Sequence, residues 1–210
     1  MDFFVYRHIR NKTYRMRVLN IIGHPNKKSF NYAIHKQIKE YCKKNGFEYK
    51  FIDLYLDKFD PVLHEKESQH NQQLIQTYQE RINWADVVVI TSPVWWFRLT
   101  TVLEGFFDKI LTPGFAYRFK SITKTYGYPQ PLLKNKKVIT FLTHGAPALP
   151  VKTIYVNSVK LRLLLGVYSF SFGWFKQKIY QFWSVPFVSD KTRIKYLNRV
   201  DKILKRQLKD

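Results

Sequence analysis

Three short segments of the chain carry residue types that bind phosphate groups or flat conjugated rings. The first runs from Gly23 to Asn31 and leads into a predicted helix, whose free backbone N–H groups and positive dipole end favour a phosphate group. Ser29 and Asn31 can add hydrogen-bond donors, and His24 or Lys28 can add positive charge. The segment lacks the glycines of a dinucleotide fingerprint or a P-loop, and an ordinary capped helix explains it equally well.

The second segment holds three consecutive aromatic residues, Trp95, Trp96 and Phe97, shortly after a strongly apolar run. Adjacent side chains of an extended chain point to opposite faces, so these three cannot all enter the core. A conjugated ring needs an apolar wall together with backbone donors and acceptors, and the preceding Pro93 and Val94 extend such a wall. The segment therefore predicts a wall for an aromatic ligand, and the alternative is a hydrophobic patch at a protein interface.

The third segment, Thr143-His144-Gly145, offers a hydroxyl group, an imidazole ring and a glycine that allows close approach of the backbone. We interpret His144 as a hydrogen-bonded structural histidine rather than as a catalytic base. We assign neither a metal site nor a catalytic residue from the sequence.

Apolar runs and helical periodicities alternate along the chain, as expected of strands and helices in turn. The predicted strands are 17–22, 48–54, 87–90, 138–142 and 167–172. The predicted helices are 29–45, 74–82, 102–110, 151–165 and 194–204, with a polar loop before residue 138. Such alternation implies a parallel sheet with helices on both faces, and five strands suggest the order 2-1-3-4-5. The ligand crevice of this arrangement lies beyond the carboxyl ends of strands 1, 3 and 4, which the three segments follow.

Several motifs occur in a family-specific order. They are His24-Pro25-Asn26 with residues 29–33, then residues 53–63, and then residues 93–97 continuing through 103–109 to Gly114-Phe115-Ala116-Tyr117. In this order they resemble the flavodoxin-like NAD(P)H:quinone oxidoreductases. That group includes the DT-diaphorases, the bacterial modulator-of-drug-activity proteins and the ancillary oxidoreductases of potassium-efflux systems. The resemblance covers residues 16–170.

The resemblance implies an α/β fold of the flavodoxin-like, three-layer type with a bound FMN or FAD. It implies two-electron reduction of quinone-like acceptors by ping-pong hydride transfer, with NAD(P)H as the electron donor. The matched positions assign flavin contacts to His24, Ser29, Phe30, Asn31, Pro93, Val94, Trp95, Trp96, Phe97, Thr143, His144 and Gly145. It also implies a homodimer with the flavin site at the interface, where Tyr117 closes the partner's pocket.

This chain departs from the family's pattern near the predicted flavin. His144 stands where relatives usually have glycine, which adds bulk and a titratable ring. The Tyr/His pair that assists hydride transfer in the animal enzymes has no aligned counterpart, since Tyr155 falls on a predicted helix. The catalytic residues and the acceptor therefore stay open, as does the choice between FMN and FAD.

The net charge leaves an alternative function open. The chain has 36 Lys and Arg against 15 Asp and Glu, a net charge of +21, but no run of five or six like charges marks a polybasic tail. We prefer to interpret this as a solvated basic surface. The charge also suits peripheral association with a membrane, so the alternative function is a flavin-binding regulatory subunit of a membrane potassium-efflux system. We do not expect nucleic acid as a partner, because no binding motif accompanies the charge.

The length suits one domain, which we place at residues 16–210. Residues 1–15 precede Met16 and the first strand, and we interpret them as a disordered extension or an unused upstream start. The single cysteine, Cys42, cannot form an internal disulfide and is expected to be buried in a helix. We therefore expect a reducing compartment and a cytoplasmic protein.

Overall fold

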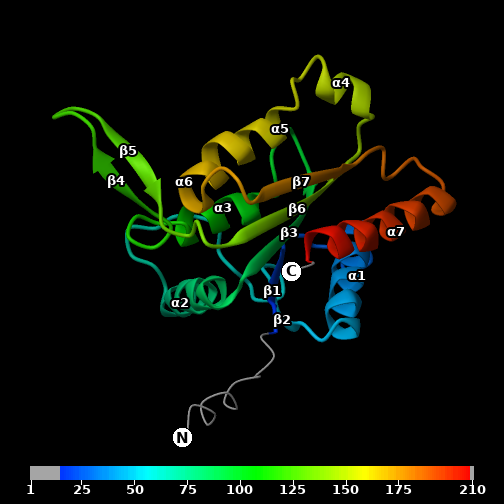
Figure 1. Cartoon of the computed structure of the whole chain (residues 1–210), viewed down its shortest axis with the longest axis horizontal. Coiled ribbons are helices and arrows are strands. Elements are labelled where there is room, and N and C mark those ends of the chain that lie inside the picture. The colour runs from blue at the N-terminus through cyan, green and yellow to red at the C-terminus, as the bar shows by residue number, and fades with distance from the viewer. Residues whose placement is uncertain (1–14, 209–210) are drawn as a thin grey trace, which may run out of the picture.

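Five parallel strands form a sheet that lies between two layers of helices (Figure 1). The computed structural model describes residues 15–208, so the extension predicted for residues 1–15 lies outside it except for Arg15. The strands follow one another in the order β2-β1-β3-β6-β7, and each pairing is parallel. They are β1 (Arg17–Ile22), β2 (Glu48–Asp53), β3 (Val87–Val94), β6 (Lys137–His144) and β7 (Gln177–Phe182). The α/β fold with a five-stranded parallel sheet is thus confirmed.

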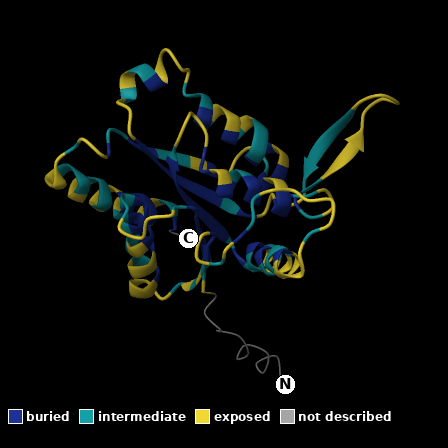
Figure 2. Cartoon of the chain, turned by 180° about the vertical axis from the view of Figure 1, so that it is seen from behind, coloured by how far each residue is buried: buried dark blue, intermediate teal, exposed yellow. Residues whose placement is uncertain are grey.

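Helices cover both faces of the sheet, and each face has its own hydrophobic core. The helices are α1 (Phe30–Lys44), α2 (Gln69–Trp84), α3 (Thr101–Ile110), α4 (Ala148–Lys152), α5 (Ser158–Leu161), the π-helix η1 (Arg162–Tyr168), α6 (Ser169–Phe172) and α7 (Asp190–Gln207). α1 and α7 pack on one face, and α2, α3 and the α5–η1–α6 segment pack on the other. The sheet is consequently buried between them (Figure 2), and a strand shielded on both sides needs a continuous apolar run such as Val87–Ile90.

The last strand of the sheet is not where the sequence pattern placed it. Residues 167–172, predicted as a strand, are helical and belong to η1 and α6, whereas the edge strand is β7. A short apolar run cannot be told from a buried helix by periodicity alone. Here Tyr168 is fully buried, and its hydroxyl oxygen lies 2.7 Å from Thr140 Oγ1 on β6. The predicted fifth strand was therefore wrong, and the order in the numbering of Figure 1 is 2-1-3-6-7.

The helix predicted over residues 151–165 is interrupted. α4 ends at Lys152, and the turn that follows holds Val156 and Asn157 at left-handed φ angles of 43° and 51°. Helix geometry resumes only with α5. Residues with positive φ cannot continue a right-handed helix, so the apolar periodicity of this stretch spans two separate helical segments.

A β-hairpin occupies the stretch that was predicted as a polar loop. It consists of β4 (Tyr117–Ser121) and β5 (Gly127–Pro131), paired antiparallel outside the main sheet. The hairpin projects from the body of the molecule (Figure 1). Its charged residues and prolines are typical of loops and of exposed edge strands alike, which is why the sequence did not reveal it.

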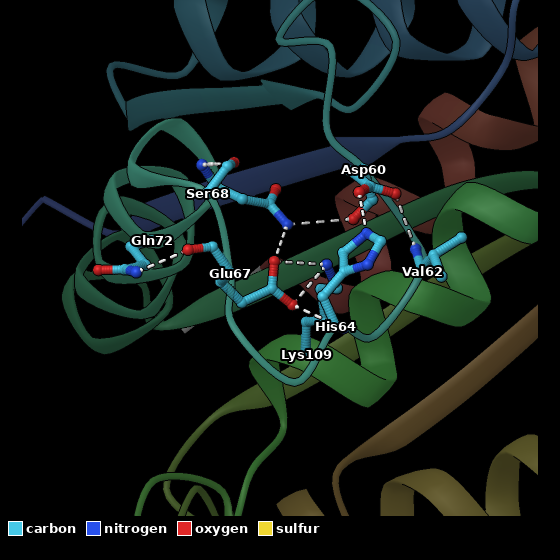
Figure 3. A network of polar contacts seen from close by, with 8 residues as sticks. Asp60, Val62, His64, Glu67, Ser68, Gln72 and Lys109 are labelled. Carbon is cyan, nitrogen blue, oxygen red and sulfur yellow. Dashed lines mark hydrogen bonds and ion pairs between the residues drawn. The ribbon is translucent and has the colours of Figure 1, made fainter.

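A polar network holds the segment between β2 and α2 against α3 (Figure 3). Its centre is Lys109, whose side chain is 1% exposed. The Lys109 Nζ atom lies 2.7 Å from Glu67 Oε1. Asn71 Nδ2 donates to Glu67 Oε2 at 2.6 Å, and His64 lies 2.7 Å from Asp60. The hydrogen bond from Lys109 holds the pKa of Glu67 below its usual range. Removing either partner would leave a poorly hydrated charge unpaired, so the network pins this segment in place.

Cys42 is buried in α1, as predicted, and burial raises the pKa of its thiol to about 12. A thiol in this environment packs as a small apolar group and does not react as a thiolate.

Among residues 15–208, no helix is both long and apolar enough to cross a membrane. The same part of the chain holds no group of three His, Cys, Asp or Glu side chains placed to bind a metal ion.

Gly105 provides a test of the contact between α3 and the β2–α2 segment. A Cβ atom at this position would lie 2.2 Å from the carbonyl oxygen of Pro61 and 2.5 Å from its Cα. Because backbone atoms cannot move aside cheaply, Gly105→Ala should lower the free energy of unfolding by about 1–3 kcal/mol, measured by urea denaturation. The matched control is Gly166→Ala in η1, where the new Cβ would have no neighbour within 4 Å and no loss of stability is expected. Equal unfolding midpoints for the two variants would contradict this packing.

Candidate functional site

A cavity of about 390 Å³ opens at the carboxyl ends of β1, β3 and β6. Its volume lies in the range of small-molecule sites. Strand register brings two of its walls together, because Pro93 pairs with Thr143 and Val94 with His144. Ten of the thirteen predicted site residues line it, namely His24, Ser29, Phe30, Asn31, Pro93, Val94, Trp95, Thr143, His144 and Gly145.

The loop after β1 presents the N-terminus of α1 to the cavity. Ser29 is the N-cap residue, and its Oγ accepts a hydrogen bond from the Tyr32 N–H. Within residues 15–208, the backbone N–H groups of Phe30 and Asn31 have no acceptor, and the first turn contains no acidic side chain. An anion at this point would satisfy the free N–H groups and interact favourably with the helix dipole.

His24, in the loop after β1, lies against Trp95 in the loop after β3. Its Nδ1 accepts a hydrogen bond from the Asn26 backbone N–H at 3.0 Å, which leaves the proton of the neutral ring on Nε2. The centroid of its ring lies 5.8 Å from that of Trp95. Burial lowers the pKa of His24 below its ordinary value. At neutral pH the ring is therefore uncharged and donates from Nε2. It does not supply the positive charge that the sequence analysis considered for His24.

The loop after β3 makes a two-residue turn that separates the three aromatic side chains. Trp95 and Arg98 exchange two backbone hydrogen bonds of 3.0 Å, and Trp96 and Phe97 between them have φ angles of 50° and 58°. Positive φ at both central residues is the requirement of a type I′ turn and is costly for aromatic residues. Trp95 lines the cavity, whereas Trp96 is 91% exposed and Phe97 packs on Tyr155 with 4.3 Å between ring centroids. Contact of Trp96 and Phe97 with a flavin therefore stays a prediction.

The loop after β6 is tied to the start of α1. Asn31 Nδ2 donates to Thr143 Oγ1 at 3.0 Å, and Thr143 Oγ1 donates to Asn31 Oδ1 at 3.3 Å. The two side chains thus satisfy each other, and they join the first and third loops. Beside them, a Cβ added at Gly145 would meet no atom within 4 Å. The backbone at Gly145 is therefore open to close approach by a ligand.

His144 is held by contacts from β7 and from the loop after it. Its Nε2 lies 3.0 Å from Gln181 Nε2, and its ring stacks on Trp183 with 4.3 Å between centroids. Its carbonyl oxygen accepts a hydrogen bond from the Val185 N–H at 2.9 Å. Burial lowers the pKa of His144 to about 4. The structure thus shows the hydrogen-bonded histidine that the sequence analysis favoured.

A fourth wall of the cavity was not recognised in the sequence. Val185 and Pro186, from the loop after β7, and Arg193, from α7, line the cavity. The Arg193 guanidinium donates to the carbonyl oxygens of Val185 and Pro186, both at 3.1 Å, and lies 2.6 Å from Asp190. It places a permanent positive charge on the same cavity as Ser29. The signal was missed because the fifth strand was misplaced, so this loop was not seen to follow a strand.

Tyr117 does not line this cavity. It lies at the base of the β4–β5 hairpin and borders a second, mostly apolar cavity of about 340 Å³ together with Phe119 and Phe170. Its predicted contact with the flavin of a partner subunit stays a prediction.

The residues around the main cavity fit a flavin. The free N–H groups of α1 and the Arg193 guanidinium suit a phosphate group. Trp95 and Val94 supply an apolar wall for a flat ring. The open space beside Gly145 lets such a ring approach backbone hydrogen-bonding groups.

Comparison with known proteins agrees with this geometry. The family described as "Flavodoxin-like fold" matches residues 16–166. An uncharacterized NAD(P)H oxidoreductase of Haemophilus influenzae is 31% identical over 185 residues, which cover 85% of this chain and 89% of that protein. NAD(P)H dehydrogenase (quinone) 1 of Cavia porcellus is 29% identical over 152 residues, and the match covers 61% of this chain and 53% of that enzyme.

Solved structures share the fold as well, and two of them illustrate the likeness. Smu.1420 from Streptococcus mutans has a TM-score of 0.77 and 27% identity, with 91% of this chain and 100% of that chain covered. An FMN-dependent NADH-azoreductase from Bacillus anthracis, solved in complex with FMN, has a TM-score of 0.72 and 16% identity, with 91% and 99% covered. At 16% identity the likeness shows the fold alone. The family match and the Haemophilus relative decide the classification: the chain belongs to the flavodoxin-like NAD(P)H:quinone oxidoreductase family.

Proposed function

We propose that the protein binds a flavin, FMN or FAD, in the cavity at the carboxyl ends of β1, β3 and β6, and uses NAD(P)H to reduce quinone-like acceptors. One observation carries the proposal: residues from three separate sequence segments, all assigned to a flavin, line a single cavity. A bound flavin supplies two-electron hydride chemistry, by which donor and acceptor react in turn at one site. The relatives named NAD(P)H oxidoreductase and NAD(P)H dehydrogenase (quinone) support the classes of donor and acceptor.

The residues of the chain bind and orient the ligand. The N–H groups at the start of α1 and the Arg193 guanidinium hold the phosphate end. Trp95 and Val94 exclude water from one side of the ring. Within residues 15–208, the backbone N–H groups of Trp96 and Phe97 have no acceptor. Donors fixed in this way stabilise negative charge that develops on a ring beside them.

The absorbance spectrum of the purified protein tests the proposed function directly. We expect flavin bands near ~370 and ~450 nm that bleach when NADPH or NADH is added without oxygen, because the protein positions a hydride-transfer cofactor. Reoxidation by a simple benzoquinone should restore the bands. A colourless protein that also fails to take up added FMN and FAD would refute flavin binding.

Arg193 should contribute a charge-assisted hydrogen bond to the phosphate end of the ligand. We expect Arg193→Met to weaken binding of FMN or FAD about tenfold, measured by quenching of flavin fluorescence. Lys195→Met is the matched control, because Lys195 lies on the same helix, is exposed and does not line the cavity. An equal effect of the two substitutions would show that only the overall charge matters.

We further infer that two copies of the chain associate through the hairpin, so that Tyr117 of one copy closes the cavity of the other. The hairpin exposes the large apolar side chains of Phe119, Ile122 and Tyr126, and contiguous exposed apolar surface marks interfaces. Sedimentation equilibrium should give about twice the 25.3 kDa mass of the chain. Ile122→Asp should shift the protein toward the monomer, and Phe175→Asp, outside the hairpin, should not. A monomer at micromolar concentration would contradict the role of Tyr117.

A further inference from the structure

The side chains behind His144 decide which of its ring nitrogens carries the proton. Asn157 Nδ2 donates to Gln181 Oε1 at 3.0 Å, and Gln181 Nε2 donates to Asn157 Oδ1 at 2.9 Å. The Gln181 amide nitrogen also lies 3.0 Å from His144 Nε2. Exchanging nitrogen and oxygen in both amides would keep the reciprocal pair, so the orientation of Gln181 and the tautomer of His144 are coupled. In the orientation that the structure has, the amide nitrogen can only donate, so His144 Nε2 accepts and the single proton of the neutral ring is on Nδ1.

Nδ1 is the ring nitrogen of His144 that can hydrogen-bond to a ligand. Within residues 15–208, no group accepts a hydrogen bond from it. In this part of the chain, the only buried side-chain nitrogen or oxygen atom without a partner is Asn71 Oδ1, so Nδ1 is not sealed inside the protein. His144 lines the main cavity, and within residues 15–208 Nδ1 is its ring nitrogen without a hydrogen-bond partner.

The orientation of the ring is also restrained. Trp183 stacks on it with an interplanar angle of 27°, and Gln181 holds Nε2. A 180° rotation of the ring about its Cβ–Cγ bond would move Nδ1 away and break the contact with Gln181, although the ring would still stack on Trp183. Because burial lowers the pKa of His144 to about 4, the ring is uncharged at neutral pH. It offers a directed donor without the non-directional attraction of a positive charge.

We propose that His144 is a recognition residue of the cavity, which donates a hydrogen bond from Nδ1–H to a carbonyl oxygen or acceptor nitrogen of the bound ring. The identity of that ring as a flavin rests on the proposed function, and the flavin pyrimidine edge carries acceptors of both kinds. A glycine at this position would offer only its backbone, so the contact depends on the imidazole ring of His144. Gln181 and Asn157 act as positioning residues, because they hold the donor and do not touch the ligand.

The position of the proton is tested first, without a flavin. A long-range ¹H–¹⁵N correlation spectrum at neutral pH should show His144 protonated at Nδ1 and not at Nε2, with the signal assigned by its loss in His144→Asn. In Gln181→Glu the carboxylate can only accept, so the proton should appear on Nε2. Gln73→Glu adds the same charge on the exposed surface of α2 and should leave the proton on Nδ1. A proton on Nε2 in the unaltered protein, or a doubly protonated ring, would overturn the inference.

Hydrogen bonding to the ligand is tested next, by titrating FMN and FAD into apoprotein. An Asn side chain places its amide nitrogen near the position of Nδ1, whereas Gln places it near Nε2. We expect His144→Asn to bind within about threefold of the unaltered protein, and His144→Gln and Gln181→Glu to bind about tenfold more weakly. Equal affinities of the Asn and Gln variants would overturn the proposal, once urea midpoints show that both are folded. If the unaltered protein binds neither flavin, the proposed function fails, whereas the spectrum still decides the tautomer.

Discussion

The parallel pairing of β1, β3 and β6 is the constraint on which the rest of the structure depends. Parallel strands joined by right-handed crossovers end at the same edge of the sheet, so Ile22 lies beside Thr91 and Val94 beside His144. Close packing at this edge requires Gly23, where a Cβ atom would come within 2.7 Å of Leu103 on α3. The end of β1 can therefore approach α3 closely, and the loops that follow the strands converge on one cavity.

The loops are joined to one another as well as to their strands. The Asn31–Thr143 pair links the start of α1 to the end of β6, and the bond from Val185 to His144 links the loops after β6 and β7. The turn at Trp95 is closed by two backbone hydrogen bonds of its own. Walls connected in this way have little freedom to lose when a ligand binds. Preorganisation of this kind improves affinity by lowering the entropic cost of binding.

The large net charge bears little on the cavity itself. With 15 acidic residues for 36 basic ones, most cations have no acidic partner to pair with, and many lie on the exposed surfaces of α1 and α7. Inside the cavity, Arg193 carries a fixed charge, and burial keeps His144 neutral. The surface charge influences which molecules the protein attracts, whereas the cavity lining holds one fixed charge, on Arg193, and otherwise neutral polar and apolar groups.

Local signals in the sequence were sufficient for most of the fold and for three walls of the site. The apolar runs at 17–22 and 87–90 are strands, and α1 starts after Ser29 and ends at Lys44 before its C-cap Asn45. Periodicity and capping depend on neighbouring residues, and the rule for parallel sheets then placed the three loops at one edge.

Tertiary structure alone decided the remaining features. The last strand is Gln177–Phe182 and not 167–172, because a short apolar run such as 167–172 can be buried as a helix as well as a strand, and here it is helical. This shift is what brings Arg193 to the cavity. The ring of His144 is held by Gln181, which is distant in sequence. No local pattern encodes such a partnership, because it exists only once β6 and β7 lie side by side.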